Sequence, residues 1–463
     1  IQNYSTIFTM RKILVIGSGK SSSYLIKYFL NEAKTEKLYV TIGDINIEHA
    51  ELLIKNNPNA RAIKLDVFND KARAEAIINS DIVVSMLPAR FHIEVAKDCV
   101  TYSKNMVTAS YVSKEMLELD SAVKEKGLVF MNEIGVDPGI DHMSAMKVID
   151  SIRDRGGEMV LFESFTGGLV APESDTNLWN YKFTWNPRNV VVAGQGGAAK
   201  FLQEGKFKYI PYHRLFRRTE YLEVKGYGRF EAYANRDSLK YQSAYGLENI
   251  KTLYRGTMRR VGFSRAWQNF VMLGMTDDSY TIDDSENMSY RDFVNSFLPY
   301  SPTDSVELKF RHQLKIDQDD IVWDKFVELD IFNATKMVEL KKATPAQILR
   351  KILLDSWTLD HNDKDMIVMY HKFGFKLNGK LQQIDSTMVC IGEDQTYTAM
   401  AKTVGLPVAI ATLDILNGKI KTPGVQIPIT KEVYEPILRA LENFGIEFQE
   451  KEVPYFGYNP LNI

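Results

Sequence analysis

The sequence predicts an α/β fold: a doubly wound domain with a parallel sheet, followed by an α+β domain with a largely antiparallel sheet and a small helical insertion. Three observations support this prediction. Short apolar runs alternate with helical patterns over residues 11–137. Glycines follow the first of these runs directly. After Asp137-Pro138-Gly139, aromatic residues become dense and polar residues interrupt the apolar runs, which is typical of a sheet with one solvated face.

Length and charge narrow the classes of function. The chain has 463 residues, 45% of them hydrophobic, which suits two to three domains. Lys and Arg number 57 against 59 for Asp and Glu, and this balance argues against nucleic-acid and anionic-membrane partners. Two cysteines occur, Cys99 and Cys390, and no Cys/His cluster suggests a metal site. We expect a cytoplasmic protein with no metal and no apolar run as long as a membrane span.

Six apolar runs predict the strands of the first domain. The run over 12–16 is continuously apolar after its lysine, as expected for a parallel strand buried on both faces. The other five cover residues 39–42, 60–65, 82–87, 105–109 and 128–131. Helical patterns lie between the runs, and strands that alternate with helices predict a parallel, doubly wound sheet.

The remainder of the chain mixes strands, turns and helices. We predict strands over 160–166, 366–371 and 382–390, and a helix over 398–416. The pair Gly167-Gly168 and the run 194–197 are expected to mark turns. Residues 264–358 have a helical and charged pattern, which predicts a helical insertion.

These patterns suggest a division into domains. Residues 1–10 are interpreted as a leader or a cloning remnant, and residues 11–137 as the doubly wound domain. The C-terminal segment, from about residue 393 to residue 463, is expected to pack back onto that domain. Residues 138–263 with 359–392 form the α+β domain, and 264–358 the insertion.

The glycine-rich segment Gly17-Ser18-Gly19-Lys20-Ser21-Ser22 follows a strand and opens a helix, where a dinucleotide-binding turn must sit. Gly17 permits the tight turn. Gly19 lets the backbone approach a pyrophosphate at the positive end of the helix. Ser22 stands at the position of the usual third glycine and is still small. We therefore predict a Rossmann domain that binds its cofactor at this turn.

Asp44 ends the second strand, at the spacing of about 20 residues where the fingerprint expects an acid that accepts hydrogen bonds from the adenosine ribose. A carboxylate there repels a 2′-phosphate, so the sequence favours NAD, with NADP as the second choice. The alternative interpretation is a solvated carboxylate at a strand end. Asp66, at the end of the third strand, is interpreted as a neighbour of the adenine or as a solvated turn residue.

Several longer motifs carry a resemblance to a known family. In chain order they are TASY (108–111), NEIGVDPGIDH (132–142), GGLVAPE (167–173), YKFTW (181–185), NRDS (235–238), RGTMR (255–259), DMIVM (365–369) and AMAKTVGLP (399–407). In this order they resemble the glutamate-forming saccharopine dehydrogenases, also called saccharopine reductases. The resemblance runs from about residue 11 to the C-terminus and is weakest over 264–358.

The resemblance implies a reaction. Saccharopine would lose a hydride to the nicotinamide from the carbon beside its secondary amine. The resulting imine would be hydrolysed to 2-aminoadipate 6-semialdehyde and glutamate, a reversible step of lysine metabolism. The nicotinamide carries the redox step, so no metal is implied. The resemblance also suggests a homodimer.

Substrate contacts are expected from both domains. Saccharopine bears three carboxylates, which arginines can bind bidentately, and Arg236 and Arg259 match the carboxylate-binding positions of the family. Surface arginines that are solvated or ion-paired are the alternative. Thr257 and Met258, next to Arg259, could offer backbone contacts.

Ser110 and Tyr111 end the fifth strand and Asp137 follows the sixth, at the strand ends where such sheets bind ligands. The resemblance places all three at the substrate. Tyr111 and Asp137 are the candidate catalytic groups, which would remove the amine proton and activate water, directly or through a bound water. The alternative for Asp137 is helix capping, with Pro138 as the first helical residue. For His142 and His92 we prefer structural roles.

Further contacts to the cofactor follow from the resemblance. Lys182 to Trp185 should approach its nicotinamide end, although Phe183 fits an aromatic core strand equally well. The full set of residues expected at the cofactor is Gly17, Ser18, Gly19, Lys20, Ser21, Asp44, Asp66, Val67, Thr108, Ala109, Ser110, Val136, Asp137, Lys182, Phe183, Thr184 and Trp185.

The sequence departs from the family in one notable place. The family usually has cysteine before the double glycine, where this chain has Thr166, and proline where it has Val170. A catalytic thiol at this position is therefore excluded. Two alternatives stay open within the enzymes, an NADP-dependent saccharopine reductase and a carboxyspermidine-type dehydrogenase, whose substrates carry fewer carboxylates. A non-catalytic dinucleotide-binding protein is the alternative from another class.

Overall fold

The computed structural model describes residues 10–457, which divide into two units. Unit 1 comprises residues up to 155 together with 388–392 and 396–448, and unit 2 comprises 156–387, 393–395 and residues from 449 onward. The expected boundary at residue 137 precedes a helix that lies in unit 1, and the expected helical insertion lies within unit 2. The expected leader, residues 1–10, falls outside the described residues except for its last.

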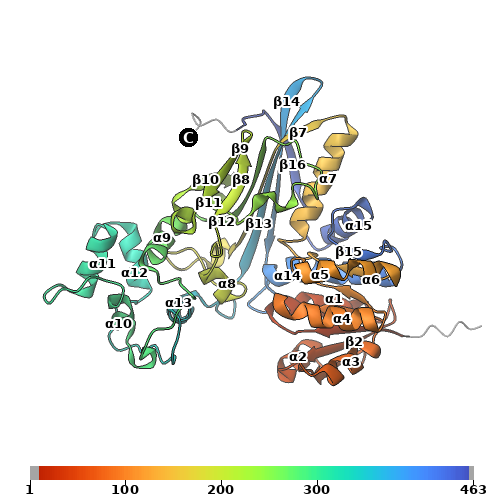
Figure 1. Ribbon diagram of the computed structural model, residues 1–463, viewed down its shortest axis with the longest axis horizontal. Coiled ribbons are helices and arrows are strands. Elements are labelled where there is room, and N and C mark those ends of the chain that lie inside the picture. Colours follow the sequence, from red (N-terminus) through yellow and green to blue (C-terminus); the bar gives the residue numbers. More distant parts are fainter. Residues whose placement is uncertain (1–9, 458–463) are drawn as a thin grey trace, which may run out of the picture. The chain divides into compact units, whose positions relative to one another are not determined.

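Unit 1 contains a seven-stranded parallel sheet in the order β15-β6-β5-β4-β1-β2-β3 (Figure 1). Its strands are β1 (Arg11–Ile16), β2 (Leu38–Asp44), β3 (Ala60–Lys64), β4 (Ile82–Ser85), β5 (Asn105–Val107), β6 (Val129–Met131) and β15 (Gly424–Gln426). The first six strands have the order of a dinucleotide-binding Rossmann sheet, so the predicted doubly wound fold is confirmed.

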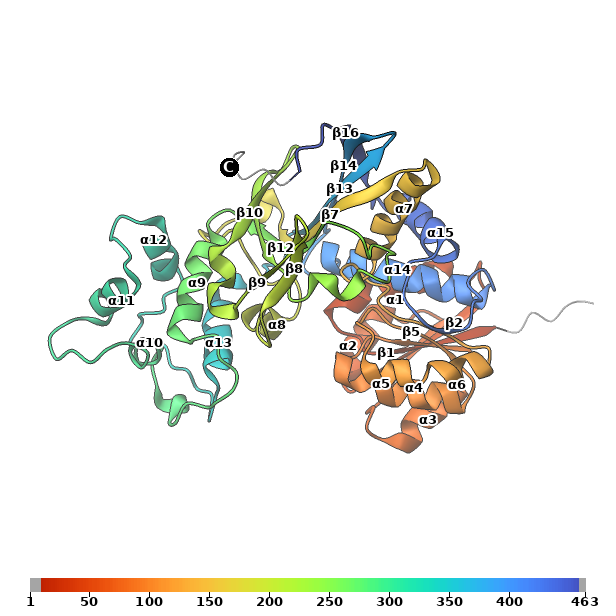
Figure 2. The same cartoon turned by 45° about the horizontal axis from the view of Figure 1, so that its top comes forward.

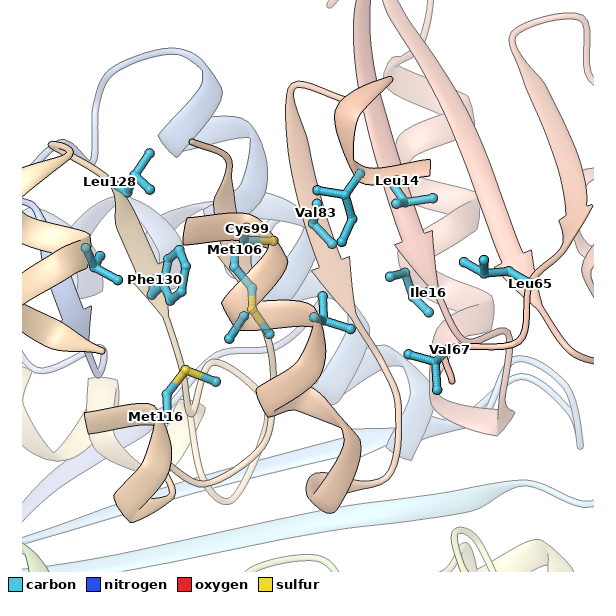
Figure 3. Close-up of a cluster of buried hydrophobic side chains, with 14 residues drawn as sticks. Leu14, Ile16, Leu65, Val67, Val83, Cys99, Met106, Met116, Leu128 and Phe130 are labelled. Atoms are coloured by element: carbon cyan, nitrogen blue, oxygen red, sulfur yellow. The ribbon is translucent and has the colours of Figure 1, made fainter. Parts of the chain in front are cut away.

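Helices cover both faces of this sheet. The helices of unit 1 are α1 (Ser23–Glu32), α2 (Ile47–Ile54), α3 (Asp70–Ile78), α4 (His92–Thr101), α5 (Lys114–Glu118), α6 (Asp120–Glu125), α7 (Ile140–Asp154), α14 (Ala399–Leu416) and α15 (Lys431–Glu442). Alternate side chains of β1 explain the double coverage. Leu14 and Ile16 enter a cluster with α3–α6, labelled in part in Figure 3, and Ile13 and Val15 are equally buried.

Helix α14 packs against α1, and Gly405 allows their close approach. A Cβ atom at Gly405 would lie 2.8 Å from the Leu25 amide nitrogen and 3.3 Å from the Ser21 carbonyl oxygen. By length and composition α14 could also cross a membrane, so the expectation of no such run was wrong. However, 78% of its apolar window is buried within the protein, as suits a core helix.

Unit 2 is built on a nine-stranded mixed sheet with the central order β10-β11-β12-β7-β13-β14-β16, and β8 and β9 extend it beside β12. Its strands are β7 (Glu158–Val170), β8 (Ala199–Gln203), β9 (Lys206–Ile210), β10 (Thr219–Val224), β11 (Gly228–Ala234), β12 (Thr252–Arg260), β13 (Asp365–Leu377), β14 (Lys380–Ile391) and β16 (Gln449–Val453). Most neighbours run antiparallel, as predicted, but β7 and β12 are parallel.

The helices of unit 2 are α8 (Pro187–Val191), α9 (Phe263–Leu273), α10 (Tyr290–Asn295), α11 (Val306–Leu314), α12 (Ile321–Glu328) and α13 (Pro345–Trp357). Figure 2 shows α10–α13 grouped around α9. An aromatic cluster joins α9 and α13 to the loop before α8. In it Trp179 and Tyr181 of the loop contact Phe263 of α9 and Trp357 of α13, with rings edge-on or tilted. This cluster includes two of the rings that surround Arg259, those of Tyr181 and Phe263.

Two local predictions were wrong. Gly167-Gly168 do not form a turn, because both residues lie inside β7. The glycine is needed for space: a Cβ atom at Gly167 would lie 2.9 Å from the Cβ atom of Met258 on the neighbouring strand β12. Pro138 does not begin a helix either. Helix α7 begins at Ile140 with Gly139 at the N-cap, and Asp141 Oδ1 accepts a hydrogen bond from the Gly139 amide at 2.6 Å.

Candidate active site

The glycine turn of unit 1 leaves open space beside its backbone. Gly17 has φ +104° and lies so close to the Met86 carbonyl that only glycine fits there. A Cβ atom at Gly19 would meet no protein atom within 4 Å. The buried Ser22 hydroxyl donates to the Gly17 carbonyl at 3.1 Å, which ties the turn to the start of the helix. The turn thus fits a pyrophosphate, because its backbone amides are approachable and the helix begins beside it.

Asp44, at the end of β2, faces this turn. Its Oδ2 accepts hydrogen bonds from the Ser18 amide at 2.6 Å and the Ser18 hydroxyl at 2.8 Å, and its Oδ1 accepts one from the Asn46 amide at 2.8 Å. Partial burial raises the pKa of Asp44, but these hydrogen bonds and nearby His49 outweigh burial, so the net pKa is lowered. The carboxylate is therefore held ionised beside the turn.

Asp66 and Val67, which were expected at the adenine, have different surroundings. Asp66 is exposed and accepts a hydrogen bond from the Phe68 amide at 3.0 Å, the contact of a turn residue. Val67 is buried in the hydrophobic cluster under α3. Their contact with a cofactor stays a prediction.

A hydrogen-bonded chain reaches Ser110 from the interior of unit 1. His92, the first residue of α4, lies with Nδ1 2.8 Å from the Ser85 hydroxyl and Nε2 2.7 Å from the Ser110 hydroxyl. Thr108 lies beside it and accepts the Ser110 amide at 3.3 Å. Burial lowers the pKa of His92 to about 4, so the ring is neutral at physiological pH. Sequence reasoning gave His92 a structural role and missed this contact with Ser110.

The two candidate catalytic groups lie close together in unit 1. The Tyr111 hydroxyl donates to Asp137 Oδ1 at a long distance of 3.5 Å, and Tyr111 is 45% exposed. Val136, beside Asp137, is buried. Ala109 is half-buried next to Ser110. The pair is thus open to solvent on the side of the tyrosine, where a small molecule can reach it.

In unit 2, Arg259 on β12 is 4% exposed, and residues 10–457 place no carboxylate within ion-pair distance of its guanidinium. One nitrogen donates to the Met258 carbonyl at 2.8 Å, while Nε has no hydrogen-bond partner in this part of the chain. The rings of Tyr181, Tyr233 and Phe263 surround the guanidinium at 4.9–5.8 Å.

Strand register brings a second polar group to the same sheet. Thr166 on β7 pairs with Thr257 on β12, two residues from Arg259, so the side chains of all three lie on one face. The Thr166 hydroxyl is buried and, within residues 10–457, makes no hydrogen bond. Thr166 is the residue that replaces the expected cysteine. Met258 points to the opposite face and is fully buried.

The remaining predicted contacts of unit 2 differ in character. Arg236 is exposed in the loop after β11, where the Asn235 side chain binds its backbone amide.

Lys182 is buried in an ion pair with Asp363 at 2.5 Å. Phe183 packs on Trp357 in the aromatic cluster, Thr184 is buried, and Trp185 is half-buried. Residues 181–184 form no strand. Cofactor contacts of 182–185 stay a prediction.

Comparison with known proteins identifies the family. Residues 13–131 match the family model described as the saccharopine dehydrogenase NADP binding domain, and residues 135–446 match the saccharopine dehydrogenase C-terminal domain. The chain belongs to the saccharopine dehydrogenase family. The resemblance predicted from the motifs is therefore confirmed. A dinucleotide cofactor is supported as well, although the description of the first model names NADP rather than NAD.

Several known proteins are similar to the chain over nearly its full length. The saccharopine dehydrogenase [NADP(+), L-glutamate-forming] of Saccharomyces cerevisiae is 33% identical over 451 residues, 96% of this chain and 99% of that protein. Mitochondrial alpha-aminoadipic semialdehyde synthase of Mus musculus is 32% identical over 96% of this chain, which spans 48% of that longer protein. The solved apo saccharopine dehydrogenase (L-Glu forming) from Saccharomyces cerevisiae superposes with a TM-score of 0.87 and 31% identity, covering 96% of this chain and all of that one.

Proposed function

We propose that this chain is a glutamate-forming saccharopine dehydrogenase that uses NAD. It would oxidise the secondary amine of saccharopine to an imine, whose hydrolysis gives 2-aminoadipate 6-semialdehyde and glutamate. The observation that carries the proposal is the buried guanidinium of Arg259, for which the described residues provide no carboxylate.

Arg259 has a charge that folding alone does not explain. A buried cation without a counterion costs several kcal/mol of stability, of the order given for ions in protein interiors. Glu231 is the cross-strand partner of Arg259, but its two oxygens accept the Gly262 and Ser264 amides at 3.0 and 2.6 Å. Glu231 therefore serves the start of α9, and the guanidinium stays available to an anion. A carboxylate of saccharopine suits it, because a guanidinium can bind a carboxylate bidentately.

The chemistry requires proton transfers that Tyr111 and Asp137 are suited to make. When bound, the nicotinamide accepts the hydride from the carbon beside the amine. Before that, the amine must lose a proton, and we propose the Asp137 carboxylate as its acceptor, directly or through a water. The Tyr111 hydroxyl, which donates to Oδ1 of this carboxylate, would orient Asp137 and assist the later addition of water.

The choice of NAD depends on Asp44. Its ionised carboxylate lies where a 2′-phosphate would bring further negative charge, which favours the ribose without that phosphate. The relatives whose names include a cofactor name NADP(+), which favours the second candidate, an NADP-dependent enzyme of the same reaction.

One assay tests both parts of the proposal. The purified chain is incubated with saccharopine and either NAD or NADP at matched concentrations, and nicotinamide reduction is followed from neutral to alkaline pH. We expect turnover with saccharopine and a higher kcat/KM for NAD. A higher kcat/KM for NADP would overturn the cofactor assignment alone, and no reduction with either cofactor would overturn the reaction.

A further inference from the structure

Glu133, in the loop between β6 and α7, has surroundings that the proposed chemistry does not yet use. The residue is 1% exposed and has φ 54°, a left-handed conformation that non-glycine residues rarely adopt. Both the burial of a carboxylate and this backbone conformation cost free energy. The contacts of Glu133 show what that cost maintains.

Three polar groups of Glu133 bind the segment that carries Tyr111 and helix α7. The Glu133 amide donates to the Ser110 carbonyl at 3.0 Å, and its Oε1 accepts the Val112 amide at 2.9 Å. Its Oε2 lies 2.9 Å from Nε2 of His142, which is fully buried in the first turn of α7. Glu133 thus holds the chain on both sides of Tyr111, and His142 holds Glu133.

The same loop carries Asp137, four residues further on. Glu133 therefore ties the backbone of Tyr111 to the loop that bears the Tyr111 hydrogen-bond acceptor. A displacement of residues 110–112 would change the distance from the Tyr111 hydroxyl to Asp137 directly, since the two side chains are hydrogen-bonded to each other.

We infer that Glu133 and His142 are positioning residues that set the geometry of Tyr111 against Asp137. This inference rests on the proposed function of that pair. Neither Glu133 nor His142 needs to touch substrate or cofactor for this role. Removing either contact should lower turnover through Tyr111, and the cofactor turn at Gly17–Gly19 should be unaffected.

The test uses substitutions that keep volume. Glu133→Gln retains an acceptor for Val112 but loses the charged contact, and His142→Leu removes the ring nitrogens. We expect kcat with saccharopine to fall about 10- to 100-fold in both, the range expected from a displacement near 1 Å. His142→Gln, which restores an N–H near the position of Nε2, should recover part of the loss. The cofactor dissociation constant should stay within about two-fold, because the backbone-held turn is intact.

A double-mutant cycle separates positioning from a merely structural role. If Glu133 acts through Tyr111, Glu133→Gln should have almost no further effect on kcat in a Tyr111→Phe background. Multiplicative losses in that background, or an equal loss of cofactor affinity, would overturn the inference. Glu118→Gln, on the exposed side of α5, is the matched control for loss of a carboxylate.

A readout without catalysis keeps this inference distinct from the proposed function. With 3-fluorotyrosine incorporated, the ¹⁹F resonance assigned by its disappearance in Tyr111→Phe should shift in Glu133→Gln and stay unchanged in Glu118→Gln. An unshifted resonance would refute the positioning role. If the unmodified chain oxidises no saccharopine, the proposed function fails, whereas the resonance still decides whether Glu133 positions Tyr111.

Discussion

At the scale of single residues, Asp44 offers the most direct test of cofactor choice. Asp44→Asn removes the charge, so the ratio of kcat/KM for NAD to that for NADP should fall about 10- to 100-fold, the equivalent of a charged hydrogen bond. Glu118→Gln is the control for loss of a carboxylate, because Glu118 is exposed on α5 and is not among the residues expected at the cofactor. An unchanged ratio in Asp44→Asn would mean that Asp44 does not select the cofactor.

Arg259 should affect stability and substrate binding in opposite directions. Arg259→Met replaces an unpaired buried cation by an apolar side chain of similar length, so the free energy of unfolding should stay equal or increase. KM for saccharopine should rise at least 100-fold, because a bidentate contact is lost. The guanidinium of the neighbouring Arg260 donates to the Tyr227 carbonyl instead. The control variant Arg260→Met should therefore leave KM for saccharopine unchanged. Strong destabilisation by Arg259→Met would indicate a structural arginine.

His92 predicts a pH dependence of stability. Its folded pKa, about 4, lies below the ordinary value of 6.5, so its contribution is complete above pH 6.5 and is lost as pH falls toward 4. The difference corresponds to about 3 kcal/mol at one site. Denaturant unfolding at pH 7 and pH 4 should show a smaller acid loss in His92→Gln than in the parent. The exposed His361→Gln serves as control, and an equal acid loss in His92→Gln would contradict the prediction.

Residues differ in how far the sequence could predict them. The place of Asp44 beside the glycine turn follows from local pattern, because a strand end and a fixed spacing define it. The surroundings of Arg259 could not be predicted, since two of its three aromatic neighbours, Tyr181 and Tyr233, come from segments distant in the sequence. The positioning contacts of Glu133 had one local signal in the sequence, the N-E-I-G motif, but the partners of Glu133 depend on the fold.

At the scale of elements, alanine substitution of two glycines of unit 1 should affect different properties: stability at Gly405 and cofactor affinity at Gly19. Gly405→Ala should destabilise the protein by more than about 1 kcal/mol despite alanine's higher helix propensity, because the new Cβ would meet the Leu25 backbone of α1. Gly19 has φ −62°, and a Cβ atom there would meet no protein atom within 4 Å. The melting temperature of Gly19→Ala without cofactor should therefore be unchanged. Cofactor affinity should fall about 10-fold or more, because the methyl group occupies the approach of the pyrophosphate. Loss of stability in Gly19→Ala would contradict this account.

The elements show where sequence patterns fail. The first six strands of unit 1 and α14 were predicted close to their observed bounds, because continuous apolar runs and helical spacing are strong signals. In unit 2, β11 and β12 were not predicted, and β13 runs six residues past the expected end at residue 371. Gly167-Gly168 was taken for a turn, since glycine pairs usually mark one. In this chain the same residues allow β7 to lie close to β12, and such a requirement for space depends on a strand more than 80 residues away.

At the scale of the whole molecule, the C-terminal segment is needed to complete unit 1. A chain ended at residue 392 would lack α14 and β15, which pack on α1 and extend the sheet beside β6. We expect this fragment to bind no NAD, measured by fluorescence titration of NADH, and co-expression with residues 393–463 to restore binding. Cofactor affinity equal to that of the full chain in the fragment alone would contradict this.

The pairing of β15 with β6 also orders events during synthesis. These strands are joined through Gly424 and Val129, so roughly 300 further residues must be translated before the sheet closes, which takes roughly 15–60 s at ordinary elongation rates. Until then β6 presents an unpaired edge and α1 an uncovered apolar face, both prone to wrong association. The nascent chain therefore gains no stabilisation from its cofactor until β15 has been translated, and chaperone demand should concentrate in that interval.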